Sequence, residues 1–127
     1  MNRPLILVVD DEPLVTQMLG MVLELNEYLE VVTTNSPLEA RDILRKSRVA
    51  LLLTDYLMPE INGLELIRIL RSGGSTIPAI ILTGYCDEPE LTANAEMLKP
   101  FEILLKPWNN ETLVQRIDFW LSQSMSS

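Results

Sequence analysis

Short, continuous apolar runs alternate along the chain with longer stretches in which apolar residues recur every three or four positions. Three of the runs are apolar throughout, at 5–9, 49–53 and 79–82. Such runs predict parallel strands that are covered on both faces, because a strand with one face in water would alternate. Two weaker runs, at 30–34 and 102–105, predict strands at the edges of the same sheet.

The segment between the first two predicted strands has the pattern of an amphipathic helix. It begins at Pro13, and proline is well suited to the first turn of a helix. Its apolar residues recur at helical spacing, at Leu14, Met18, Val22 and Leu25. This spacing predicts that these four side chains face the core.

Further helical patterns follow the other four strands, and they begin near Ser36, Gly63, Asp87 and Asn109. Ser36 is followed three residues later by Glu39, which is the spacing of a capping box. The order of elements is therefore strand then helix, repeated five times. This order predicts an α/β fold in which a parallel sheet has helices on both faces.

Length and composition narrow the class of protein. A chain of 127 residues suits one domain, 1–127, whose ends at 1–4 and 123–127 we expect to be flexible. The net charge of −8 and the lack of a Lys/Arg run argue against direct binding of nucleic acid. One cysteine and no histidine leave no disulfide framework and no histidine-based catalysis. No apolar run suits a membrane span or a signal peptide, so we expect a cytoplasmic protein.

Polar residues follow directly after four of the five predicted strands. They offer three carboxylates, one hydroxyl and one ammonium, at Asp10, Asp11, Asp55, Thr83 and Lys106. In a parallel α/β sheet, ligands bind beyond the carboxyl ends of the strands. Three close carboxylates repel one another unless a cation lies between them, and Mg²⁺ suits both oxygen ligands and phosphate chemistry. A metal, a lysine and a hydroxyl around one carboxylate indicate phosphoryl transfer, with an aspartate as the acceptor.

Each of these residues has a simpler interpretation when it is considered alone. The acidic pair at 10–11 could cap the helix that follows, and Asp55 could be a turn residue before Pro59. Thr83 could belong to a common Thr-Gly turn, and most lysines such as Lys106 are simply solvated. Their shared placement at the strand ends of one predicted sheet favours a common site over four separate explanations.

The motifs around these residues occur in a fixed order along the chain, at Val8–Pro13, Leu53–Pro59, Asn62–Gly63, Leu82–Gly84 and Leu105–Pro107. Together they resemble the CheY-like receiver domains of bacterial two-component response regulators, over essentially the whole chain. The resemblance implies a flavodoxin-like (βα)5 fold with strand order 2-1-3-4-5. It also implies a signalling module that takes part in phosphotransfer rather than an enzyme.

The resemblance assigns roles to the acidic residues. Asp55 would be the phosphoacceptor, and a sensor histidine kinase or a phosphotransfer protein would be the donor. Asp10, Asp11, Asp55 and the backbone carbonyl of Leu57 would hold Mg²⁺. The downstream partner would be an effector protein or a fused output domain outside this chain. Family members also form homodimers through the fourth helix, fifth strand and fifth helix, and the sequence leaves this open.

The resemblance also implies how the site would switch. Thr83 and Lys106 would bind the phosphoryl oxygens, and Thr83 would move on activation. The family often has an aromatic residue at the position that Ile103 occupies, so half of the usual switch differs here. We expect the nearby Phe101 to point to the other face of its strand.

Two bulky residues, Leu57 and Tyr85, flank the acceptor at positions that tune phosphoryl lifetime in the family. They predict a long-lived aspartyl phosphate, because bulk there hinders the attacking water. Trp108 follows Lys106 closely and is expected either to lie near the site or to pack on the fifth helix.

Other classes of protein fit less well. An aspartyl-phosphate phosphatase needs a second acid two residues after the nucleophile, where this chain has Leu57. A nucleotide- or flavin-binding domain needs a glycine-rich loop after the first strand, where this chain has Asp10 and Asp11. A receiver-like docking module with impaired switching stays open as the alternative, because of Ile103.

Overall fold

A computed structural model describes residues 3–84 and 98–125. Five parallel strands form one sheet in the predicted order β2-β1-β3-β4-β5. The strands are β1 (Leu5–Val9), β2 (Glu30–Thr34), β3 (Leu51–Asp55), β4 (Ala79–Thr83) and β5 (Phe101–Leu105). The described helices are α1 (Pro13–Glu24), α2 (Pro37–Lys46), α3 (Gly63–Ser72) and α6 (Asn110–Met125). The helix predicted from Asp87 lies outside the described residues.

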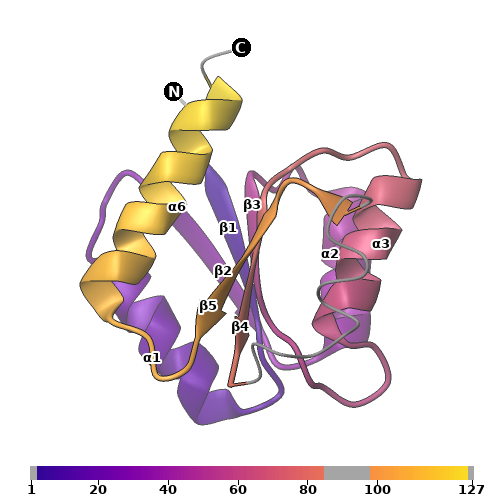
Figure 1. The fold of residues 1–127 in the computed structure, drawn as a ribbon, viewed down its shortest axis with the longest axis horizontal. Helices are drawn as coiled ribbons and strands as arrows, with labels where there is room; N and C mark the ends of the chain where they lie inside the picture. Colours follow the sequence, from indigo (N-terminus) through magenta and orange to yellow (C-terminus); the bar gives the residue numbers. More distant parts are fainter. Residues whose placement is uncertain (1–2, 85–97, 126–127) are drawn as a thin grey trace.

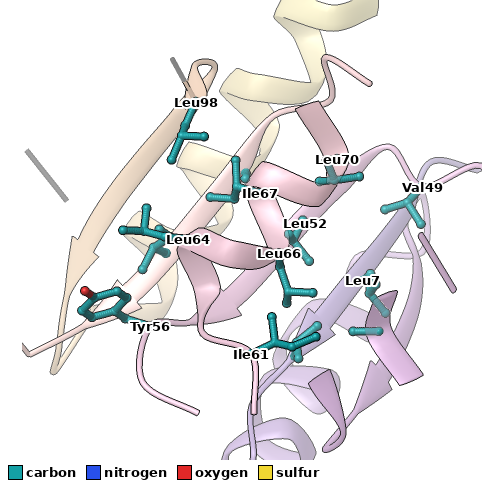
Figure 2. Close-up of a cluster of buried hydrophobic side chains, with 14 residues drawn as sticks. Leu7, Val49, Leu52, Tyr56, Ile61, Leu64, Leu66, Ile67, Leu70 and Leu98 are labelled. Carbon is teal, nitrogen blue, oxygen red and sulfur yellow. The ribbon is translucent and has the colours of Figure 1, made fainter. Parts of the chain in front are cut away.

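Helices cover both faces of the sheet, with α1 and α6 on one face and α2 and α3 on the other (Figure 1). Neighbouring residues of one strand therefore enter different cores: Leu52 packs on the α2–α3 side, and Leu51 and Leu53 pack on the α1–α6 side. Figure 2 shows the core on the α2–α3 side, where side chains of α3 such as Leu64 and Ile67 meet the sheet. This two-sided burial explains why the central strands are apolar throughout.

Side-chain caps mark the starts of α2 and α3. Ser36 supplies half of the predicted capping box, because its Oγ accepts the N–H of Glu39 at 3.1 Å. A complete capping box forms at Asn62, whose side chain and backbone exchange hydrogen bonds with Glu65. The box starts α3 soon after β3 ends, so it helps to position the loop beyond Asp55.

The prediction for α1 was wrong about which face is buried. The buried residues are Thr16, Leu19, Gly20 and Leu23, whereas Val22 is half-buried. The other residues predicted to face the core are exposed, by 79% at Leu14, 43% at Met18 and 82% at Leu25. Two apolar stripes lie side by side on this helix, so spacing alone cannot choose between them. The buried stripe is the one that brings the small residue Gly20 close to β2, where a Cβ would lie 3.4 Å from Thr33.

The prediction for Phe101 was also wrong. Residues two apart on a strand share a face, and Phe101 and Ile103 both pack against the α2–α3 core. Glu102 takes the opposite face of β5, toward α6, where it binds Arg116 and Trp120. Across the described ranges 3–84 and 98–125, the helices fall short of the length and apolar character that a membrane span requires.

Candidate functional site

Three aspartates meet at the carboxyl ends of β1 and β3. The two strands pair in parallel with Val9 opposite Thr54, so the residues that follow lie side by side. One carboxylate oxygen from each of Asp10, Asp11 and Asp55 lies within 4.8 Å of the other two. The structure therefore brings together all three carboxylates that the sequence placed at strand ends.

A lysine from the end of β5 completes the cluster. Lys106 Nζ donates a hydrogen bond to Asp55 Oδ1 at 2.8 Å and forms an ion pair with it. The backbone N–H of Lys106 donates to the carbonyl of Thr83 at 2.9 Å, so the end of β4 lies beside it. Thr83 is buried, and the Lys106–Pro107 peptide is cis. Four strand ends thus supply the polar groups of one site.

The carboxylate of Asp10 lies in surroundings that disfavour its negative charge. Its side chain is buried, Oδ1 accepts the N–H of Glu12 at 2.9 Å, and Oδ2 has no hydrogen-bond partner. Burial raises the pKa of Asp10 to about 6, and the charge on Asp55 adds to this, although the Glu12 N–H lowers it. A buried carboxylate with a bare oxygen needs a cation or a proton.

For Lys106, the surroundings favour the charged form of the side chain instead. Burial lowers its pKa, but the hydrogen bond to Asp55 and the charges of Asp55, Asp10 and Glu12 outweigh burial, so the pKa of Lys106 is raised overall. The ammonium therefore stays charged at neutral pH. Three carboxylates share this one cation among the described residues of the cluster, which leaves a deficit of positive charge. Such an all-oxygen site fits a hard divalent ion.

The sequence interpretation assigned no role at the site to two residues that support it, Asn35 and Gly63. Asn35 Nδ2 donates to the carbonyl of Asp10 at 2.9 Å and to Thr16 Oγ1 at 2.8 Å, and so ties the end of β1 to α1. Gly63 lies against the acceptor strand, because a Cβ there would be 2.5 Å from the carbonyl oxygen of Asp55. The available signal was position: Asn35 directly follows a strand, and Gly63 starts the helix after Asp55.

The structure describes three of the remaining predicted residues, Leu57, Ile103 and Trp108. The side chain of Leu57 is exposed, and Ile103 is half-buried in the α2–α3 core. Tyr85 lies outside the described residues. Trp108 packs against the α1–α6 core, and its Nε1 donates to Asn110 Oδ1 at 3.1 Å, which agrees with the interpretation that it packs on the last helix.

A doubly wound sheet with three aspartates and a lysine at its strand ends defines a receiver-type signalling domain. The chain matches the model of the response regulator receiver domain over residues 6–118 and belongs to this family. It is therefore a receiver of the two-component response regulators.

Relatives and solved structures agree with this membership. The chain is 34% identical over 119 residues to the transcriptional regulatory protein GlrR of Escherichia coli, and 36% identical over 121 residues to a CpxR homolog of Haemophilus influenzae. These matches cover 94% and 95% of this chain but 26% and 52% of the relatives, so the chain spans about a quarter to about half of their length.

Two solved receivers show the same fold. A receiver domain protein from Clostridium thermocellum matches with a TM-score of 0.85 and 27% identity, over 96% of this chain and 97% of that one. FixJ-N matches with a TM-score of 0.82 and 27% identity, over 96% of each chain. These likenesses support a response regulator function and do not favour a module that only docks.

Proposed function

We propose that Asp55 accepts a phosphoryl group from a phosphohistidine on a sensor histidine kinase or phosphotransfer protein. The observation that supports this most is the 2.8 Å contact between Lys106 Nζ and Asp55 Oδ1 within the cluster of three carboxylates. The acceptor carboxylate is nearly buried but lies at the open end of the strands. Charge neutralisation and positioning are what phosphoryl transfer needs from a protein.

The same site would hold Mg²⁺ through the carboxylates of Asp10, Asp11 and Asp55 and the backbone carbonyl of Leu57. The bare Oδ2 of Asp10 and the deficit of positive charge fit this ion. When bound, the ion would neutralise charge on the phosphoryl oxygens. Lys106 would hold one of those oxygens by its ammonium, and the Thr83 hydroxyl would donate to another.

We further propose that the charge on Asp55 changes how the receiver contacts its output, a separate effector or a fused domain. The relatives named as transcriptional regulators make a regulator of transcription a suitable output. Leu57, with its exposed side chain, would slow hydrolysis of the aspartyl phosphate, as would Tyr85. Leu57→Asn should therefore speed loss of the phosphoryl group, measured as the decay of phosphorylated protein. An unchanged decay rate would remove this role.

The test of the acceptor uses intact-mass spectrometry after incubation with acetyl phosphate and Mg²⁺. The wild-type protein should gain the mass of one phosphoryl group, and omission of Mg²⁺ with a chelator should prevent the gain. Asp55→Asn should gain none. Asp42→Asn, an exposed position on α2 with the same change of charge, should behave as wild type. Labelling of Asp55→Asn equal to wild type would contradict the proposal.

A further inference from the structure

The loop between β1 and α1 carries two of the three clustered aspartates, and the side chain of one asparagine bridges it. Asn35 directly follows β2, and its Nδ2 donates to the carbonyl of Asp10 at 2.9 Å and to Thr16 Oγ1 at 2.8 Å. Asp10 directly follows β1, and Thr16 lies in the first half of α1. The two hydrogens of one amide therefore join the two ends of the loop that contains Asp11.

The bond to the Asp10 carbonyl acts on the peptide group that leads to Asp11. The carbonyl of Asp10 and the Cα of Asp11 lie in one plane, because the peptide bond does not rotate freely. On the preceding side, the N–H of Asp10 donates to the carbonyl of Thr34 at 3.3 Å. Two consecutive residues at the end of β2 thus hold both peptide groups of Asp10, and this sets the direction in which the chain enters Asp11.

The bond to Thr16 holds the other end of the loop. The Thr16 side chain is buried, and its hydroxyl donates in turn to the carbonyl of Pro13 at 3.0 Å. The N–H of Thr16 donates to the carbonyl of Glu12 at 3.3 Å. The start of α1 is therefore a fixed anchor for the Asn35 amide, and the loop cannot move against α1 without breaking one of these bonds.

The Asp11 carboxylate depends on this backbone for its placement. No hydrogen bond or ion pair joins that carboxylate to any other described residue. The other two carboxylates of the cluster are held directly, because Asp10 Oδ1 accepts the N–H of Glu12 and Asp55 Oδ1 accepts from Lys106. One Asp11 oxygen nevertheless lies within 4.8 Å of an oxygen of each. The conformation of the loop is what keeps Asp11 in the cluster.

We propose that Asn35 is a positioning residue for the divalent cation: its amide holds the loop between β1 and α1 so that the Asp11 carboxylate lies in the cluster before the ion binds. This rests on the proposed Mg²⁺ site. A ligand that is already in place loses less conformational freedom on binding than one in a loose loop, so the bridge raises the affinity for the ion. Asn35 acts through Asp10 and Asp11 and is not itself a ligand.

The test is the dissociation constant for Mg²⁺, measured by isothermal titration calorimetry without a phosphodonor. Asn35→Ala removes both donors and should weaken binding by on the order of tenfold, as the loss of a group that orients a metal ligand does. Asn35 is exposed, so its truncation opens no cavity in the core. Asn26→Ala is the matched control, because Asn26 Nδ2 also donates to a backbone carbonyl, that of Leu23, but beyond the opposite end of α1. It should bind Mg²⁺ as wild type does.

A second pair of variants changes the other end of the bridge. Thr16→Val removes the hydroxyl that accepts from Asn35 and should also weaken Mg²⁺ binding, whereas Thr16→Ser keeps the hydroxyl and should retain more of the affinity. Labelling of Asp55 by acetyl phosphate should be slow in Asn35→Ala at low Mg²⁺ and should recover toward the wild-type rate as Mg²⁺ is raised. A general loss of structure would not be restored in this way. Circular dichroism checks that each variant is folded.

A dissociation constant of Asn35→Ala equal to that of wild type, or an equal loss of affinity in Asn26→Ala, would overturn the proposal. Wild-type protein that binds no Mg²⁺ would overturn the proposed metal site and this inference with it. The two failures are distinguishable, because the first is seen only in the variants and the second already in the wild-type titration.

Discussion

The acceptor end of the sheet and the outward face of α1 differ in how directly the sequence determines them. At the acceptor end, each functional side chain directly follows or ends a strand, so the strand order alone brings Asp10, Asp55 and Lys106 together. On α1, two apolar stripes compete for the core, and packing against β2 selects the one with Thr16 and Gly20. The positions of residues along the chain are enough to predict the acceptor end. To predict the buried face of α1, side-chain volumes are needed as well.

The largest expected effect tests the two faces of α1. Leu23 is fully buried and Leu25 is 82% exposed, although both are leucines near the end of the same helix. Leu23→Ala should lower the free energy of unfolding by about 2–5 kcal/mol, because it removes a buried side chain and leaves a cavity. Leu25→Ala should change it by less than about 0.5 kcal/mol. Urea unfolding followed by circular dichroism measures both, and equal losses would mean that the assigned faces are wrong.

Most of the fold and the centre of the site could be predicted because they depend on local signals. Continuous apolar runs define buried strands, and residues next to them must share one edge of the sheet. The errors arose where a choice depends on contacts distant in sequence. Asn35 binds the carbonyl of Asp10, and Glu102 binds Arg116. The spacing of apolar residues along the sequence predicts neither contact.

The next prediction concerns Asp10 and the sign of its pH dependence. Its folded-state pKa of about 6 lies above the ordinary value of 3.8, so between these values the folded state keeps a proton that the unfolded state has lost. In Mg²⁺-free buffer, stability should therefore fall as pH rises through this window. At pH 7, Asp10→Asn should raise the free energy of unfolding by up to about 3 kcal/mol, since it removes the buried charge.

Thermal unfolding with and without Mg²⁺ distinguishes the removal of the buried Asp10 charge from a general change in stability. Mg²⁺ should stabilise wild type and should stabilise Asp10→Asn less, because one ligand is gone. Asp42→Asn is the control, as an exposed carboxylate remote from the cluster. A stability of Asp10→Asn at or below that of wild type without Mg²⁺ would show that the Asp10 carboxylate is not under strain.

A third prediction tests how tightly the acceptor end is packed. Gly63→Ala places a methyl group where a Cβ would lie 2.5 Å from the Asp55 carbonyl oxygen, so the backbone must shift. It should cost about 1–3 kcal/mol and slow the labelling of Asp55 by acetyl phosphate. At Gly73 the nearest atoms lie at 3.6 Å, which is ordinary contact, so Gly73→Ala should leave both stability and labelling close to wild type. Labelling rates that match in the two variants would count against close packing at Gly63.

The smallest expected effect lies at the far end of the outward face of α1. Tyr28, in the turn after α1, donates a hydrogen bond to Asp118 of α6. Burial raises the pKa of Tyr28 to about 12, and the hydrogen bond and charge of Asp118 add to it. Between its ordinary value of 10 and about 12, the folded state keeps the phenol proton that the unfolded state loses, so stability should fall as pH rises. Tyr28→Phe should weaken this alkaline dependence in thermal unfolding and change little at pH 7. If the alkaline slopes of the two proteins coincide, the Tyr28–Asp118 contact does not help to hold the turn after α1 against α6.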